Sequence, residues 1–510
     1  MTIDRRRSRR DFIRQLACLA ASGGAAALMP QLRMMGTALA AAAPSSLSGY
    51  KALVCVYLSG GNDAWNMLVP YDQTRYDAYS SSRGGAYDVN TNPGGLALSR
   101  PSTAAQIAAQ VITDAADGQP YFVHPSIPEI KSLYTQNRMT FVGNVGTLVR
   151  PITKTDYNAS AANRPPQLFS HSDQENLWHV GTAADDRYGW GGDSMAVLKP
   201  QFPPGGNAVL SPCISIAGSN KFEVGSQIFP YQMASSSSGT ANPLSQLSGV
   251  CNPSGCTGYS GQRDVGLNLL LAGTYQSSFA SEYQRTFQRG RDLFALLYSG
   301  LGSPDGQIST AFPANNSLAS ELLSVARMIK LSRANNYAAR QIFYVRFGGF
   351  DLHAGLMGVA PNAHAALLAK VSQALKAFSD ALVEINSIND VTTFTMSEFA
   401  RTLSSNGSGS DHGWGSVQMA MGGGVVGGRL YADGGGPITG FPDETISLVG
   451  GNNTNPVAFS RGQFIPGIGV EQYAATLARW LGVTSTTDLD AIFPNLGNFN
   501  QAFRNLGFLA

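Results

Sequence analysis

Charged residues are scarce in this chain. Only 13% of its 510 residues are Asp, Glu, Lys or Arg, and the formal net charge is +2 at pH 7. A chain so close to neutral has no basic field that would attract nucleic acid or an anionic membrane surface. We therefore expect no nucleic-acid partner.

Cysteine is also rare and its positions are scattered. The five cysteines do not form the paired spacing of a Cys-rich zinc knuckle, which excludes that kind of site. Cys55 lies in an apolar run and is expected in the core. Cys251 and Cys256 bracket Asn-Pro-Ser-Gly, and an oxidising compartment could close this loop with a disulfide.

The N-terminus has no apolar run long enough to span a membrane. Residues 8–14 form a twin-arginine export motif around Arg9 and Arg10, and an Ala-rich stretch broken by Gly23 and Gly24 continues to about residue 43. A spanning helix needs ~20 apolar residues. We predict that residues 1–43 are a signal segment recognised by the twin-arginine export machinery, that the mature protein is periplasmic or secreted, and that it has no stable membrane insertion.

Histidine, which can bind metal or transfer protons, is also scarce. The chain has six: His124, His171, His179, His353, His364 and His412. A single His in a helical run, such as His364, is usually structural. Two others belong to Asp/His pairs in polar loops, Asp351-Leu-His353 and Asp411-His412. Carboxylate and imidazole are ligands of divalent ions such as zinc or manganese, so the two pairs predict a metal site.

Apolar runs and amphipathic segments alternate along the chain. This alternation predicts an α/β fold with a mostly parallel central sheet sandwiched by helices, in a single domain of residues 44–510. Ser/Gly-rich insertions are expected near 72–120 and 203–262, the second as a lid or subdomain. The predicted strands are 52–58, 139–144, 341–346 and 391–395, with short strands at 208–210 and 213–217 inside the second insertion. The predicted helices are 127–134, 278–298, 317–334, 363–386 and 470–483.

Two further positions have the right setting for a site. Asp63 follows the first apolar run in a Gly turn, where ligands of α/β sheets bind, although a turn Asp can also simply satisfy backbone donors. Ser170 and Ser172 flank His171 at the start of a helix-like run. A hydroxyl there feels the positive helix dipole and could be a nucleophile, or it could only cap the helix, and His171 could bind metal or act as acid or base.

Several sequence blocks carry a family resemblance. Arg9-Arg10, SGGNDAWN, SHSDQENLW, GGFDLH, SEFARTLSSNGSGSDHGWG and EQYAATLARWLGV resemble the twin-arginine-exported family called domain of unknown function 1501, DUF1501, over most of the mature chain. That family is similar in turn to the alkaline phosphatase and sulfatase superfamily. The resemblance implies an alkaline-phosphatase-like fold, one metal on Asp63, Asp411 and His412, a second on Asp351 and His353, and Ser170 or Ser172 as the nucleophile.

The chain departs from that superfamily at two points. Its first pair is spaced Asp-x-His, whereas the superfamily uses a wider spacing. No histidine follows His412, so the third histidine for the first metal is either His171 or His124, or it is missing.

The resemblance implies an exported, metal-dependent hydrolase of phosphate or sulfate esters that forms a covalent intermediate, with zinc, manganese or calcium as its divalent metal. The alternative is a non-catalytic envelope binding or assembly protein that keeps the fold. The substrate would be a small-molecule or polymer ester, and the sequence carries no signal for an oligomeric state.

The hydrolase interpretation predicts that replacing Asp411 or His412 with Ala abolishes both bound metal and activity. The measurement is elemental analysis of the mature protein, purified without affinity metals, for the wild type and Asp411→Ala in parallel. Activity retained in the variants would contradict it.

Overall fold

The computed structural model describes residues 47, 49–181, 188–201, 210–235, 258–436, 457–459 and 461–510. The chain divides into two units, Met1–Ser46 and Leu47–Ala510, and the fold below is that of the second. The predicted signal segment and the pair Cys251 and Cys256 lie outside the described residues. None of the helices in the described ranges is both long and apolar enough to cross a membrane.

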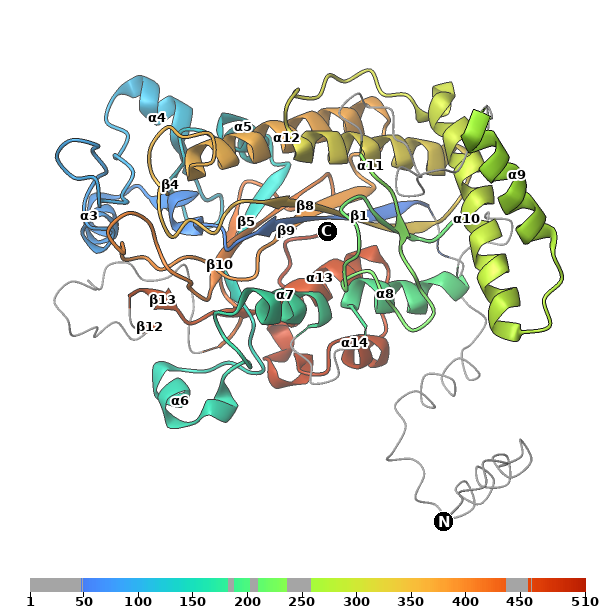
Figure 1. The fold of residues 1–510 in the computed structure, drawn as a ribbon. Coiled ribbons are helices and arrows are strands. Elements are labelled where there is room, and N and C mark those ends of the chain that lie inside the picture. Colours follow the sequence, from blue (N-terminus) through green and yellow to red (C-terminus); the bar gives the residue numbers. More distant parts are fainter. Residues whose placement is uncertain are drawn as a thin grey trace, which may run out of the picture. The chain divides into compact units, whose positions relative to one another are not determined.

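A mixed, mostly parallel sheet forms the centre of Leu47–Ala510 (Figure 1). Its middle strand, β1 (Lys51–Ser59), pairs in parallel with β8 (Arg340–Gly348) on one side and β9 (Val391–Met396) on the other. The remaining strands are β5 (Met139–Gly146), β6 (Cys213–Ser215), β7 (Tyr231–Gln232), β10 (Ser416–Met421), β11 (Leu430–Tyr431) and β14 (Ile468–Gly469). The strand order is β11-β5-β10-β9-β1-β8-β6-β7, β14 pairs with β5, and only β10 runs antiparallel to its neighbours.

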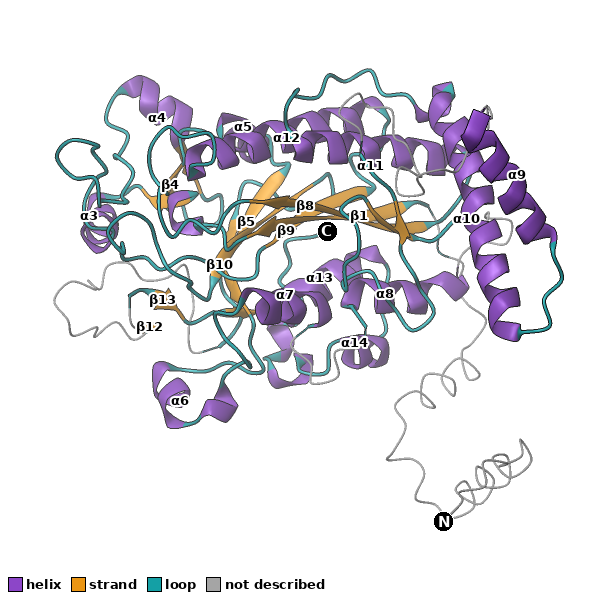
Figure 2. Cartoon of the chain, in the orientation of Figure 1, coloured by secondary structure: helices purple, strands orange, loops and turns teal. Residues whose placement is uncertain are grey.

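Helices cover both faces of this sheet, as Figure 2 shows. Side chains alternate along β1, so Val54 and Val56 join the cluster that includes α5 (Pro128–Thr135), α11 (Ser317–Ala334) and α12 (His364–Glu384). Leu53, Cys55 and Tyr57 join the opposite cluster, which includes α8 (Trp190–Leu198), α13 (Val470–Leu481) and α14 (Thr486–Ile492). The α/β class and the buried position of Cys55 are confirmed.

The long amphipathic segments become helices because their apolar residues recur at three- and four-residue steps. In α12, Leu367, Leu368, Val371, Leu375 and Phe378 are all buried. The remaining helices are α3 (Gln73–Ser82), α4 (Ala104–Gln110), α6 (Lys154–Ala159), α7 (His171–Val180), α9 (Gly258–Ala272) and α10 (Ser278–Gly302).

The two predicted insertions differ in how they relate to the main sheet. The first contains α3, α4 and β3 (Val111–Thr113), which forms a small antiparallel sheet with β4 (Pro120–Val123) and β2 (Leu68–Pro70). The second is in part a continuation of the main sheet, because β6 pairs in parallel with β8. The strand predicted at 213–217 is confirmed as β6, but its pairing with a strand more than 100 residues away was not predicted. A further two-stranded hairpin joins β12 (Ala458–Phe459) and β13 (Gln463–Phe464).

The register of β1 on β8 brings two loops together. Ser59 pairs with Gly348, so the Gly turn after β1 lies beside the loop that carries Asp351. Gly60 has φ +118°, and a Cβ at this residue would lie 2.3 Å from the backbone nitrogen of Asp351. The close approach of these loops therefore needs glycine.

We predict that Gly60→Ala lowers the free energy of unfolding by about 2–5 kcal/mol, combining about 1–2 for the backbone conformation and about 1–3 for overpacking. Gly118→Ala is the control, because Gly118 has φ +73° but a Cβ added there would meet no atom within 4 Å. It should show only the conformational cost of about 1–2 kcal/mol. Urea unfolding measures both, and equal losses would show that the contact with Asp351 is unimportant.

Candidate metal centre

The candidate site lies where the carboxyl ends of β1, β8 and β9 meet one edge of the sheet. The loop after β8 carries Asp351 and His353, and the loop after β9 carries Asp411 and His412. His171 is the first residue of α7. Residues from three separate parts of the chain therefore meet at one place.

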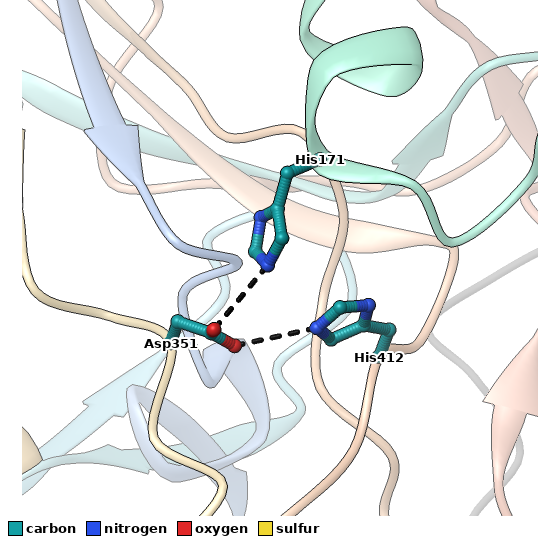
Figure 3. Close-up of side chains that lie close together, drawn as sticks. All are labelled: His171, Asp351 and His412. Atoms are coloured by element: carbon teal, nitrogen blue, oxygen red, sulfur yellow. Dashed lines mark hydrogen bonds and ion pairs between the residues drawn. The ribbon is translucent and has the colours of Figure 1, made fainter.

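Three side chains point toward one another here (Figure 3). Nε2 of His171 lies 3.4 Å from Oδ2 of Asp351, and Nε2 of His412 lies 3.3 Å from its Oδ1. Their ligand atoms are all within 4.8 Å of one another, which is close enough to share one metal ion. Neither of the two metal groups implied by the resemblance has this combination of residues.

His353 adds a third imidazole beside this group. Its Nε2 lies 3.0 Å from Nε2 of His412 and 3.1 Å from Oδ1 of Asp351. Its side chain is 46% exposed, so this side of the group opens to solvent.

The other ring nitrogen of each histidine faces a hydrogen-bond acceptor. His171 Nδ1 donates to Glu398 Oε1 at 2.8 Å, and His412 Nδ1 donates to the carbonyl of Phe169 at 2.7 Å. We assign the protons to Nδ1 because a carbonyl and a carboxylate only accept. The Nε2 atoms then present lone pairs, and Nε2 of His171 is buried with the Asp351 carboxylate as its polar neighbour. This orientation is typical of imidazoles that bind metal.

The carboxylate of Asp351 is held by a buried arginine. Arg401 Nη1 donates to Asp351 Oδ1 at 2.6 Å. Partial burial pushes the pKa of Asp351 upward, but the hydrogen bond and positive charge of Arg401 outweigh it, so this pKa lies below its usual value. Asp351 is therefore ionised at neutral pH.

The two clustered histidines differ in basicity. The hydrogen bond to Glu398 raises the pKa of His171, against the opposing effect of burial. Burial lowers the pKa of His412. The acceptors of the two rings also differ: His171 donates to a buried carboxylate and His412 to a neutral carbonyl.

Asp411 contacts His353 and not the three-residue group. Its Oδ1 lies 3.2 Å from His353 Nδ1 and accepts from Asn406 Nδ2 at 3.0 Å, while its Oδ2 pairs with Arg461. Burial raises the pKa of Asp411, but hydrogen bonds from Asn406 and His353 bring it below its usual value. Asp411 therefore contacts Nδ1 of His353, whereas Nε2 of His353 faces His412.

Asp63 also lies outside the three-residue group. Its two oxygens bind the guanidinium of Arg83, and both side chains are buried. A metal role for Asp63 would require Arg83 to move away, and would leave a buried arginine without its carboxylate.

The two candidate nucleophiles lie at the start of α7. Ser170 occupies the N-cap position, but its hydroxyl makes no capping hydrogen bond and donates instead to Asp173 Oδ2 at 2.5 Å. Ser172 is exposed, with its Oγ 3.4 Å from that of Ser170. Of the two, Ser170 has a carboxylate that can accept its proton.

His124 and His364 pack against each other elsewhere, with ring centroids 6.1 Å apart. His124 Nδ1 accepts from Ser126 N at 3.0 Å. Burial lowers the pKa of His124 to about 3 and that of His364 to about 4, so both are neutral. Of the two candidates for a third histidine, His171 is the one that the structure brings to the site.

Two residues of the site, Arg401 and Phe169, have no signal in the sequence that would single them out. Arg401 is buried among loops and reaches Asp351 across 50 residues. Phe169 contributes only its carbonyl, from a backbone with φ +80° that non-glycine residues rarely adopt. Glu398 is a buried carboxylate that accepts from His171 Nδ1.

Comparisons with known proteins bear on part of this site. The model of the family described as "Protein of unknown function (DUF1501)" matches residues 312–435. This supports the DUF1501 resemblance. The matched segment carries Asp351, His353, Asp411 and His412, whereas His171 precedes it. No curated protein matches the chain significantly.

Two solved structures are similar at a low level. Their titles are "Crystal structure of Ps i-CgsB in complex with k-i-k-neocarrahexaose" and "Crystal structure of Ps i-CgsB". Each matches 89% of this chain and 77% of its own at 10% identity and a TM-score of 0.33. A likeness at this score carries no argument about fold or activity.

The buried pair of Asp63 and Arg83 gives a stability prediction. Arg83→Met should lower the free energy of unfolding by about 3–5 kcal/mol, because it leaves the Asp63 carboxylate buried without its partner. Adding Asp63→Leu should recover much of this loss, since no charge then remains. Urea unfolding measures both variants.

The control for that experiment is the half-exposed pair of Lys376 and Asp380 on α12. Asp380→Asn should cost no more than about 0.5 kcal/mol. A loss of similar size in Arg83→Met would mean that Asp63 does not depend on its partner.

Proposed function

We propose that this chain is an exported, metal-dependent hydrolase of phosphate or sulfate esters with an alkaline-phosphatase-like fold. The observation that supports it is the convergence of His171 Nε2, His412 Nε2 and the Asp351 carboxylate within 4.8 Å. We infer one divalent ion on these three residues, with His353 beside them as a fourth ligand.

The chemistry of these donors fits a borderline divalent ion. Imidazole nitrogens together with one carboxylate suit zinc or manganese, whereas calcium prefers oxygen ligands. The buried Nε2 of His171 faces the Asp351 carboxylate at 3.4 Å, so a cation bound there would interact with both groups. The ionised Asp351 would offset part of the charge of such a cation.

Each remaining part of the site has a role in this proposal. A bound divalent ion would polarise the ester and stabilise charge on its oxygens. Ser170 Oγ would attack phosphorus or sulfur and pass its proton to Asp173. The bond to the ester oxygen would break, and the alkoxide would take up a proton from solvent and leave as the alcohol. Water would then release phosphate or sulfate from Ser170. Ser172 remains the alternative nucleophile.

The second candidate function is a non-catalytic binding or assembly protein of the cell envelope. One observation favours it: Asp63 and Asp411, two of the carboxylates expected to bind metal, are paired with Arg83 and Arg461. The remaining group would then hold one structural ion, with no second ion for chemistry.

The experiment compares metal content and ester hydrolysis in the wild type, Asp351→Asn and His412→Gln. We expect about one equivalent of zinc or manganese in the wild type and none in either variant, because each variant removes a ligand. Hydrolysis of aryl phosphate or sulfate esters should fall to background in both. Asp380→Asn, the same change on the surface of α12, should keep metal and activity.

Three outcomes separate the functions. Metal with ester turnover in the wild type supports the hydrolase. Metal without turnover of any phosphate or sulfate ester favours the binding protein. A wild type that takes up no zinc or manganese on titration rejects the metal centre.

A further inference from the structure

Glu398 lies buried directly behind His171. Its side chain is 1% exposed, and its Oε1 accepts from His171 Nδ1 at 2.8 Å. The same oxygen accepts from the backbone N–H of Gly60 at 2.8 Å, and Oε2 accepts from the hydroxyl of Tyr57 at 3.2 Å. Donors from β1, from the turn after it and from α7 thus fix the direction of this carboxylate.

The backbone of Glu398 also holds α7. Its carbonyl accepts from Trp178 Nε1 at 3.1 Å. Trp178 and His171 lie about two helical turns apart on α7. A single residue after β9 therefore anchors the helix at two points, once through its side chain and once through its carbonyl.

We propose that Glu398 is the positioning residue of the metal centre: it fixes the ring and the proton of His171 so that Nε2 faces Asp351. This inference rests on the proposed function, because the ring that Glu398 orients is a proposed ligand. Loss of such an outer partner typically weakens metal binding by about 10–100-fold while the ligands themselves stay in place.

The other two imidazoles do not offer an equivalent test. The acceptor for His412 is a backbone carbonyl, which no side-chain substitution removes. The acceptor for His353 is Asp411, which also pairs with Arg461 on the exposed side of the site. Glu398 is a buried acceptor, and replacing it directly affects one proposed ligand, His171.

The chain offers a matched control for this residue. Glu175 lies on α7 one turn after His171, and its carboxylate binds Arg346 at 2.7 and 3.1 Å. Glu175→Gln therefore removes the same charge near the same helix without touching the His171 ring. Comparing Glu398→Gln with Glu175→Gln separates the orientation of His171 from a general change in charge.

The experiment is titration of full-length mature protein with Co²⁺, followed by competition with Zn²⁺. We expect Glu398→Gln to bind both ions about tenfold or more weakly than the wild type, with an altered visible spectrum of the Co²⁺ form. Glu398→Ala should bind more weakly still, so that Gln partly rescues Ala. Glu175→Gln should match the wild type, and circular dichroism should confirm that all the proteins are folded.

A second measurement does not depend on metal. Because the chain has six histidines, ¹⁵N-histidine labelling with His171→Gln as the assignment control can locate the proton of His171 at alkaline pH. The inference requires it on Nδ1 in the metal-free wild type. A proton on Nε2 overturns the inference.

The outcomes distinguish this inference from the proposed function. Equal affinities of Glu398→Gln and the wild type overturn the role of Glu398 and leave the metal centre intact. A wild type that binds neither ion rejects the metal centre, and with it a metal-positioning role for Glu398.

Discussion

The parallel pairing of β1 with β8 and β9 is the constraint on which the candidate site depends. Parallel strands end at the same edge, so the turn after β1, the loop after β8 and the loop after β9 all begin there. Gly60 allows the first two loops to touch. The helix α7 then adds His171 to this edge, and it is held there by side-chain contacts to Glu398 and Arg346, not by strand pairing.

Electrostatics decide which of the converging groups can bind a cation. Asp63 and Asp411 have arginine partners that occupy their oxygens. Asp351 also has an arginine, but it still faces two Nε2 lone pairs with its carboxylate. His171 and His412 each donate a hydrogen bond from Nδ1 to an acceptor outside the group. The result is a cluster of acceptors with few donors, which is the arrangement that a divalent ion stabilises.

Much of the fold could be predicted from local pattern. The sequence predicts the helix 317–334 with the bounds that α11 has, because its apolar residues keep a helical period throughout. The apolar runs of β1, β5, β8 and β9 are long enough to identify as buried strands. The short strand β6 lies within the predicted strand 213–217, but its pairing with β8 was not predicted, so the segment around it reads as an insertion although it belongs to the main sheet.

The residue types of the site could be predicted from the sequence, but their arrangement in space could not. Scarce histidines beside aspartates in polar loops single out Asp351, His353, Asp411 and His412 without any structure. The grouping of Asp351 and His412 with His171, the pairing of Asp63 with Arg83 and the contribution of the Phe169 carbonyl depend on contacts between distant segments. The sequence by itself thus determined the α/β layering and the candidate ligands, because both follow from local periodicity and side-chain chemistry. Only the tertiary structure decided which ligands meet, because that depends on strand register and on buried ion pairs between residues far apart in the chain.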